Sequence, residues 1–598
     1  MPTYKAPLED MQFILDEVID YPSLTTLPGY ADFDGEMASA VLAQAAQFCE
    51  EVLQPINQVG DAEGCSLSNG VVRTAPGFKE AYDQYVQGGW PALAADPAFG
   101  GQGAPQVLRF AVEEMICASN LSFGMFPGLS HGAYHALLVH GESSLQRTWL
   151  PKLADGSWAG TMCLTEAHSG TDLGLLTTKA DPIPDGDGAY AITGQKIFIS
   201  AGDHELTPNI VHLVLARLPD APPGIKGISL FIVPKFLLDA NGEPATRNGV
   251  HCVSLEHKMG IKASPTCVMS FERATGWLVG EAHKGMRGMF TMMNAARLAV
   301  GMQGLGLSEV AYQNAVTYAR DRLQGRALTG AKNVAAEADP IIVHPDVRKN
   351  LLAIRSFNEG ARALALWVGK HIDLHEKAED PAVREAADDY VALMTPIVKA
   401  YFTDMGFECT NYALQMYGGH GYIREWGMEQ FVRDARIAQI YEGANGIQAL
   451  DLVGRKLPMH GGRLLRRFFH PVVALLERTK DDARLAEFHG PLSKAVQRLQ
   501  QVTAHVAAAS LRNPDEAGAA SADYLRLFGL VAVSEMWFRM AEVSLDRLPS
   551  ANGRRAFYET KLKTARFWFT RMLPEMHTCV ARVMAGAAPV MAMDASEF

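Results

Sequence analysis

One glutamate, Glu442, stands where a carboxylate could act as a base on carbon. It lies in the segment RDARIAQIYEGANGIQ, Arg433 to Gln448, in which an apolar helical pattern gives way to a glycine-containing turn. We expect the first helix to end at Tyr441 and Asn445-Gly446 to cap the next one. A carboxylate in such a gap can face a cavity, and loss of water there raises its pKa toward the working pH. A surface glutamate at a helix end is ordinarily the commoner case, so the interpretation of Glu442 as a general base depends on the motifs that accompany it.

A second segment lies just upstream of this turn. Gln415 to Tyr422 reads QMYGGHGY and follows a long helical pattern. Glycines such as Gly418 and Gly419 are typical of a helix C-terminus, so a purely structural role is one interpretation. Backbone without side chains also lets a ligand approach closely, which is compatible with a binding role at the same place.

Size, charge and cysteine usage limit the class of protein. The chain has 598 residues, 48% of them hydrophobic, so it can form several domains with a large core. A formal net charge of -12 argues against a nucleic-acid partner, because phosphate binding needs clustered basic residues. The eight cysteines contain no C-x-x-C pair and the eighteen histidines no metal-ligand spacing. We therefore expect no metal site, no disulfide framework and a reducing cytoplasmic location.

The ends of the chain carry no membrane signal. The N-terminus is acidic and does not read as a signal peptide, and no apolar run approaches the ~20 residues of a spanning helix. The apolar stretch from Leu527 to Phe538 is shorter and predicts a core helix. A peripheral contact of the C-terminal helices with a membrane stays open.

The order of the periodic segments predicts an α+β protein in four parts. Residues 1–160 read as an N-terminal helical domain and residues 161–282 as an antiparallel β domain. Residues 283–458 read as a helical bundle that carries Glu442, and residues 459–598 as an extra helical C-terminal domain. The expected strands are Tyr190–Ile192, Lys196–Ser200, Ile210–Ala216, Ile228–Pro234 and Cys267–Phe271.

Long helices are expected at three places in the bundle. Their patterns cover Met292 to Tyr318, Asp346 to Leu366 and Ala386 to Met416. In the last domain, we expect Pro471, Asn513-Pro514 and Pro549 to Gly553 to separate successive helices.

Four further motifs identify a family when they are taken with the Glu442 turn. They are MCLTEAHSGTD from Met162, TGQKIFISAG from Thr193, KMGIKASPT from Lys258 and NAAR from Asn294. These motifs, and the order in which they occur, resemble those of the acyl-CoA dehydrogenase family over about residues 35–455. The longer chain, with its insertion after Leu328 and its additional C-terminal helices, resembles a bacterial subgroup of this family. Members of that subgroup act on fatty acyl-CoA or on 3-methylmercaptopropionyl-CoA.

The resemblance implies a cofactor, FAD, and a division of roles among the motifs. Glu442 would abstract the α-proton of an acyl-CoA, and the β-hydride would pass to the flavin. The thioester carbonyl would be polarised by the backbone N–H of Glu442 and a ribityl hydroxyl. Asn294, Arg297 and Gly443 would contact the substrate. The implied FAD contacts are Met162, Leu164, Thr165, Thr171, Phe198, Ser200, Arg322, Gln415, Gly418, Gly419 and Asn445.

Some positions depart from the family pattern. Phe198 replaces the usual tryptophan, Thr171 the usual serine and Ala444 a frequent threonine. The RDRLQGR segment that contains Arg322 lacks the phenylalanine of R-x-x-F-G, and an added loop, Thr329 to Asp339, follows it.

Family membership also implies partners. Electron transfer flavoprotein would accept the electrons, and the chain would form a homodimer or a larger homo-oligomer. Two alternatives stay open: an acyl-CoA oxidase that passes electrons to oxygen, and a catalytically silent scaffold that binds CoA esters. A third reading, a Ser130 nucleophile in GLSHG, is disfavoured because no strand precedes that serine.

Overall fold

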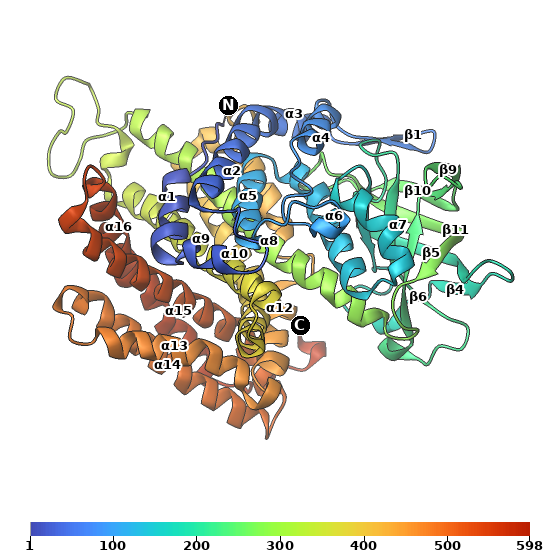
Figure 1. The fold of residues 1–598 in the computed structure, drawn as a ribbon. Helices are drawn as coiled ribbons and strands as arrows, with labels where there is room; N and C mark the ends of the chain where they lie inside the picture. Colours follow the sequence, from blue (N-terminus) through green and yellow to red (C-terminus); the bar gives the residue numbers. More distant parts are fainter. Residues whose placement is uncertain (1) are drawn as a thin grey trace. The chain divides into compact units, whose positions relative to one another are not determined.

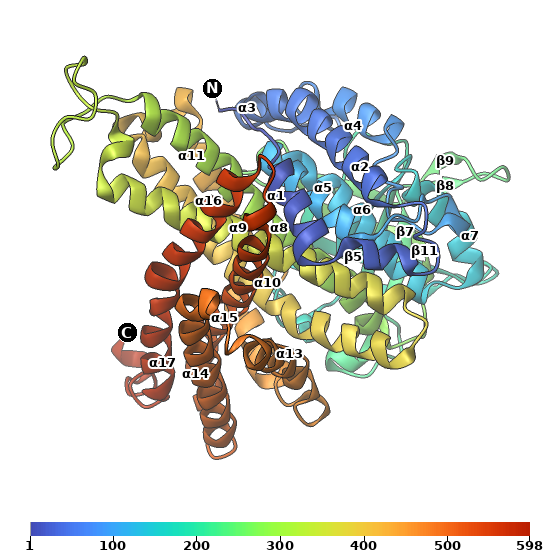
Figure 2. The same ribbon diagram turned by 60° about the vertical axis from the view of Figure 1, so that its left-hand side comes forward.

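The computed structural model describes residues 2–598, which form two compact units (Figures 1 and 2). The sheet unit comprises Gln47–Ala104 and Ser119–Ala299. The helical unit comprises the residues up to Ala46, Pro105–Ala118 and Val300–Phe598. No helix of the described residues is long and apolar enough to cross a membrane, and all eight cysteines are free.

The sheet unit is built on seven strands in the order β10-β11-β5-β4-β6-β3, with β7 pairing both β11 and β6. Two short hairpins, β1-β2 and β8-β9, complete its strands. The strand bounds are β1 Ser66–Ser68, β2 Val71–Arg73, β3 Ala159–Cys163, β4 Lys179–Pro182, β5 Ala189–Ser200, β6 Ile210–Arg217, β7 Ile228–Pro234, β8 Phe236–Leu238, β9 Pro244–Arg247, β10 Val250–Leu255 and β11 Thr266–Leu278.

The sheet differs from the expected one in two respects. β3 and β4 both pair with β6 in parallel, so the sheet is mixed, although the other pairings are antiparallel. A parallel neighbour needs a long crossover, and the chain between β3 and β6 supplies one. The two strands expected around Gly194 form one strand, β5. Thr193 pairs with Lys179, and Gly194 and Gln195 pair with β11, so the ladder continues through the glycine.

The sheet unit also contains helices. They are α3 Gln54–Glu63, α4 Phe78–Gln87, α6 Leu121–His140, α7 Ser143–Ala154 and residues 285–299 of α8. Helix α6 packs on β3 so closely that a Cβ at Gly160 would lie 2.5 Å from the Cβ of Ala133. The Gly160 N–H donates to Ser130 Oγ at 3.0 Å across this contact. Only glycine fits at this point, which sets the distance between helix and sheet.

The helical unit contains the long helices. Those predicted for the bundle are confirmed and extend beyond the predicted ranges. The bounds are α1 Leu8–Phe13, α2 Gly35–Phe48, α5 Gln106–Ser119, α8 Gly285–Asp321, α9 Pro345–Lys377, α10 Pro381–Met416, α11 Met428–Ala438, α12 Asn445–Asp451, α13 Arg463–Thr479, α14 Ala486–Ser510, α15 Asp515–Arg547, α16 Arg555–Phe567 and α17 Met576–Met584, with α2, α5 and α8 continuing into the sheet unit.

The last five helices, orange to red in Figure 1, pack on one another and on the bundle. The segment Leu527–Phe538 is buried in α15, as predicted for a core helix. The Trp537 Nε1–H of α15 donates to the carbonyl of Ser356 on α9 at 2.9 Å. The extra helices therefore form part of the hydrophobic core of the helical unit.

One predicted break is wrong. Pro471 lies inside α13 instead of ending it, whereas the breaks at Asn513-Pro514 and near Pro549 are confirmed. Proline in a helix removes a hydrogen bond and costs ~3 kcal/mol. The buried side chains of Leu464, Phe468 and Val472 on either side of it supply packing that outweighs this cost.

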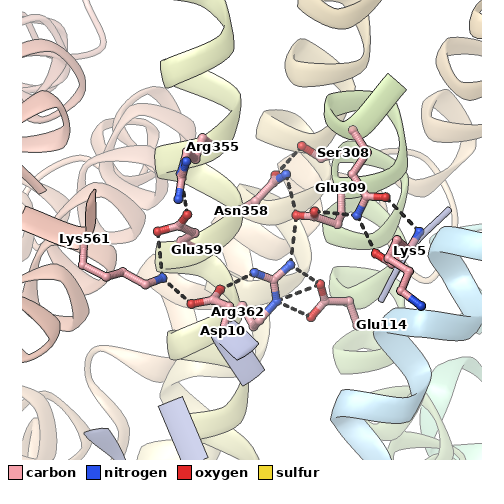
Figure 3. Close-up of polar contacts among 11 residues, drawn as sticks. Lys5, Asp10, Glu114, Ser308, Glu309, Arg355, Asn358, Glu359, Arg362 and Lys561 are labelled. Atoms are coloured by element: carbon pink, nitrogen blue, oxygen red, sulfur yellow. Dashed lines mark hydrogen bonds and ion pairs between the residues drawn. The ribbon is translucent and has the colours of Figure 1, made fainter. Parts of the chain in front are cut away.

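A buried ionic cluster joins distant segments of the helical unit (Figure 3). Arg362 of α9 donates to Glu114 of α5 at 2.9 and 3.0 Å, to Glu309 of α8 at 2.9 Å, and to Asp10 of α1. Lys561 of α16 also donates to Asp10. We name this set the Arg362 cluster; it consists of Asp10, Glu114, Glu309, Arg355, Glu359, Arg362 and Lys561.

Candidate active site

Glu442 lies in the turn between α11 and α12, with a backbone φ of 57°. Helix α11 ends at Ala438, three residues before the predicted end at Tyr441. The Ile440 and Tyr441 N–H groups both donate to the carbonyl of Ile437, which tightens the chain into a turn. A left-handed backbone is costly for a non-glycine residue, so the surrounding structure must hold Glu442 in place.

Two buried side chains hold the carbonyl groups of this turn. Lys399 of α10 donates from Nζ to the Gly443 carbonyl at 2.9 Å. Gln448 of α12 donates from Nε2 to the carbonyls of Glu442 at 3.2 Å and Gly443 at 3.1 Å. Lys399 and Gln448 are both fully buried. The Glu442 carbonyl is therefore anchored from α12, and the Gly443 carbonyl is anchored from both α10 and α12.

Asn445 corrects a prediction about the second helix. It is the first residue of α12, Ala444 is the residue before it, and no side chain caps this end. Instead, Asn445 Oδ1 accepts from Lys399 at 2.8 Å, and its Nδ2 donates to Asp404 at 2.7 Å. The carboxylate of Asp404 also accepts from Gln439 at 2.6 Å. Long-range partners on α10 thus outcompete the local cap.

Tyr441 is anchored on the N-terminal side of Glu442. Its O–H donates to Gln303 of α8. Burial, together with the nearby Cys117 and Glu442, raises the pKa of the Tyr441 phenol well above its usual range. The phenol therefore stays protonated and remains a donor, and the backbone of Glu442 is held on both sides.

The glycine segment after α10 matches its prediction as a helix end. Helix α10 ends at Met416, and Gly418 follows in a left-handed conformation with φ of 56°. A Cβ added to Gly418 or Gly419 would meet nothing within 4 Å. Gln415 is exposed on the last turn of α10. These residues leave open space beside bare backbone.

Arg322 is exposed just after the end of α8. Its carbonyl accepts from Ile341, which closes the inserted loop that projects at the upper left of Figures 1 and 2. Asp339 organises this loop by accepting from the backbone of Ala327 at 2.9 Å and of Lys332 at 2.9 Å. The insertion is a defined loop with Arg322 at its base.

In the sheet unit, the LTE segment after β3 is anchored by a buried ion pair. Glu166 accepts from Lys196 Nζ at 2.9 Å and from the backbone and hydroxyls of Thr177 and Thr178. Lys196 also donates to the carbonyl of Leu164 at 2.9 Å. Burial alone would raise the pKa of Glu166, but Lys196 and the threonine donors bring it down to about 2. Thr165 is thus held between two fixed neighbours.

The predicted flavin contacts of the sheet unit differ in exposure. Leu164 is buried, Met162 and Thr165 are half-buried, and Thr171 is exposed. Phe198 of β5 is 60% exposed and has a φ of 59°, while Ser200 is half-buried. Positive φ is rare for an aromatic residue, and its combination with an exposed ring favours a functional role over a core role.

Two predicted substrate contacts lie on α8. Arg297 is buried, and its Nη1 donates to Oδ1 of the exposed Asn294 at 3.3 Å. The third, Gly443, directly follows Glu442 in the turn of the helical unit. Ser130 lies within α6, where its hydroxyl donates to the carbonyl of Phe126 at 3.1 Å, so it is not on a strand-to-helix elbow.

Sequence reasoning did not find the residues that support the motifs. Lys399, Asp404 and Gln448 brace the Glu442 turn, and Lys196 braces the LTE segment. The one available signal was a lysine or glutamine on an otherwise apolar face, because such a residue must find buried partners.

Comparisons with known proteins cover nearly the whole chain. Four family descriptions match in order: the acyl-CoA dehydrogenase N-terminal domain over residues 36–157, its middle domain over 161–274 and its C-terminal domain over 283–457. The fourth, "Acetyl-CoA dehydrogenase C-terminal like", matches residues 468–594.

Individual relatives match over almost their full lengths. The 3-methylmercaptopropionyl-CoA dehydrogenase of Ruegeria pomeroyi is 41% identical, with 96% of each chain covered. The broad-specificity linear acyl-CoA dehydrogenase FadE5 of Mycobacterium tuberculosis is 33% identical, with 96% of each chain covered. An acyl-CoA dehydrogenase of Bacillus anthracis, solved with FAD, shares the fold with a TM-score of 0.74 and 19% identity, covering 98% of this chain and 92% of that one.

Proposed function

Because the chain belongs to the acyl-CoA dehydrogenase family, we propose that it converts an acyl-CoA to the trans-2-enoyl-CoA with Glu442 as catalytic base. The protein is an FAD-dependent oxidoreductase of this family. The observation that supports Glu442 in this role is its place in a clamped turn. Its backbone is held on one side through Tyr441 and on the other through the carbonyls of Glu442 and Gly443.

The residues present fit an FAD. Phe198 offers an exposed aromatic ring on the sheet unit, as contact with a planar ring system requires. Gly418 and Gly419 leave space beside bare backbone in the helical unit. We propose that the following residues contact the cofactor: Met162, Leu164, Thr165, Thr171, Phe198 and Ser200 of the sheet unit, and Arg322, Gln415, Gly418, Gly419 and Asn445 of the helical unit.

The reaction breaks two C–H bonds and forms one C=C bond. Glu442 takes the proton from the α-carbon, which becomes acidic because the thioester carbonyl can carry the developing negative charge. The Glu442 N–H donates to that oxygen and stabilises the charge. FAD, when bound, accepts the hydride that leaves the β-carbon. An acyl chain that excludes water from Glu442 disfavours its charged form and strengthens it as a base.

Asn294, Arg297 and Gly443 are the proposed substrate contacts. The acyl group is either a fatty acyl chain or 3-methylmercaptopropionyl, the substrates named for the two relatives. We propose electron transfer flavoprotein as electron acceptor, a homodimer as the assembly and a cytoplasmic role in fatty-acid breakdown. We also propose that the chain consists of four domains, which end at residues 160, 282, 458 and 598.

An anaerobic titration tests this function. The purified protein is mixed with a panel of acyl-CoAs, including 3-methylmercaptopropionyl-CoA and linear esters of several lengths, while the visible flavin band is recorded. We expect bleaching by at least one ester, and the most effective ester identifies the acyl class. A yellow protein that no ester bleaches contradicts the proposal, and rapid hydrogen peroxide formation in air identifies an oxidase instead.

A further inference from the structure

Lys399 is an unusual residue for the interior of the helical unit. It lies in the middle of α10 and is 0% exposed. Burying an ammonium group costs several kcal/mol unless strong acceptors surround it, so such a residue needs a reason to be there. It donates to the Gly443 carbonyl at 2.9 Å in the Glu442 turn and to Asn445 Oδ1 at 2.8 Å at the start of α12.

Gln448 reaches the same turn from α12. Its Nε2 donates to the carbonyls of Glu442 and Gly443, while its Oε1 is buried and accepts no hydrogen bond from the residues that the structure describes. An unsatisfied buried acceptor destabilises the folded state, because it gives up its hydrogen bonds to water without replacement. A glutamine is therefore poor for stability at this position, and only its donor group is used.

The two donors constrain the direction of the Glu442 side chain. A peptide group is planar, so fixing the Glu442 and Gly443 carbonyls fixes two successive peptide planes. Tyr441 fixes the chain on the other side through its O–H and its N–H. The left-handed φ of 57° at Glu442 is thereby maintained, and with it the direction of the Cα–Cβ bond.

We propose that Lys399 and Gln448 are positioning residues, which hold the Glu442 turn so that the carboxylate meets the α-proton in a reactive geometry. This inference rests on the proposed function of Glu442. Proton transfer depends steeply on distance and angle, and a misplacement of ~1 Å can cost ~100-fold in rate. Lys399 and Gln448 share the Gly443 carbonyl, so either one partly replaces the other when one is removed.

The test uses the holoenzyme and anaerobic stopped-flow reduction by the best ester. We expect Lys399→Met and Gln448→Met each to slow the limiting rate of flavin bleaching ~10- to 100-fold, with the half-saturating ester concentration changed less than ~3-fold. The double variant should lose more than the product of the two single losses, because no donor then holds Gly443. Lys399→Arg, which keeps a cation, should recover part of the rate.

Lys370→Met is the matched control. Lys370 of α9 is half-buried and donates to a backbone carbonyl and to Ser23 at 3.0 Å, but it does not touch the Glu442 turn. This variant should bleach at the wild-type rate. Gln448→Met removes an unsatisfied acceptor together with two donated hydrogen bonds, so we expect little change in its thermal midpoint. A slower rate at an unchanged midpoint separates positioning from a purely structural role.

Several outcomes overturn the inference. Limiting rates of Lys399→Met and Gln448→Met within ~2-fold of wild type contradict it while the proposed function stands. Equal slowing by Lys370→Met, in step with lost stability, shows a structural role only. If Lys399→Met does not fold, the limiting rates of flavin bleaching in Gln448→Met and Lys399→Arg test the inference instead. A wild-type protein that no ester bleaches removes the proposed function, and the inference falls with it.

Discussion

At the scale of single residues, the proposed chemistry depends on a carboxylate, Glu442, whose environment is set by its neighbours. Glu442 occupies a costly backbone conformation that persists because Lys399, Gln448 and Tyr441 hold both sides of it. Glu166 shows the opposite use of a buried carboxylate. Lys196 and threonine donors keep it charged, so it serves as an anchor and not as a base.

Glu442→Gln tests the base directly. The amide has nearly the same size but cannot accept the α-proton, so we expect flavin reduction to slow by ~100-fold or more while the yellow colour is retained. The rate of bleaching and the visible spectrum measure the two properties separately. Glu379→Gln, an exposed position just before α10, is the control and should bleach normally. Full activity in Glu442→Gln would falsify the assignment.

Glu166 gives a prediction about acid stability. Its pKa in the folded protein is about 2, below the ordinary 4.5, so its contribution is present above pH 4.5 and is lost as pH falls toward 2. Between pH 6 and pH 3.5, the urea midpoint of Glu166→Gln should therefore fall less than that of wild type. The exposed Glu281→Gln should follow wild type. If the urea midpoint of Glu166→Gln falls with pH as steeply as that of wild type, the role of this ion pair is contradicted.

At the scale of elements, helix ends decide where the site residues stand. Helix α11 stops at Ala438, and α10 stops at Met416 before the left-handed Gly418. These two ends release the Glu442 turn and the glycine segment from helical geometry. Continuing either helix would point the next residues elsewhere, because each helical residue rotates its side chain by about 100°.

Two glycine substitutions separate a required left-handed glycine from a tolerated helical one. Gly418→Ala should cost ~1 kcal/mol, because alanine disfavours positive φ even where its Cβ meets open space. Gly518→Ala in α15 also meets open space but has an ordinary helical backbone, and should gain ~0.5–1 kcal/mol. Denaturation midpoints at equal FAD content measure both. Stabilisation by Gly418→Ala would refute the proposed helix end.

At the scale of the molecule, the Arg362 cluster gives the extra C-terminal helices a polar attachment inside the helical unit (Figure 3). Lys561 comes from α16, Asp10 from the first helix and Glu114 from α5. Burial and the neighbouring Glu309 and Asp10 raise the pKa of Glu114 to about 7, against the opposing effect of Arg362. A cluster with more carboxylates than cations relieves repulsion by holding a proton.

The cluster predicts a pH dependence of opposite sign to that of Glu166. A carboxyl whose folded pKa is raised to about 7 adds stability below pH 4.5, and this is lost as pH rises through 7. Between pH 5 and 8, wild type should lose on the order of 3 kcal/mol that Glu114→Gln does not lose. Urea denaturation at several pH values tests this, with the exposed Glu379→Gln as control. Parallel curves for wild type and Glu114→Gln would exclude the protonation.

Removing the shared cation of the Arg362 cluster should lower the free energy of unfolding at any pH. Arg362→Met removes the shared cation and leaves Glu114, Glu309 and Asp10 buried without it, so we expect a loss of ~3–5 kcal/mol. Arg463→Met, at a more exposed pair with Asp389, is the control and should lose ~1 kcal/mol or less. Equal losses in the two variants would contradict a central role for Arg362.

The local features of this protein could be predicted from its amino-acid sequence. Helical periodicity, glycine and turn chemistry placed the long helices, most strands, the helix end before Gly418 and Glu442 between two helices, because these follow from neighbouring residues. The end of α11, the helical conformation at Pro471 and the contacts of Asn445 with α10 could not be predicted in this way. Those outcomes depend on partners far apart in the chain, as Lys399 and Gly443 are 44 residues apart. Hydrogen bonds and packing across such distances outweigh local preference and leave no periodic pattern to read.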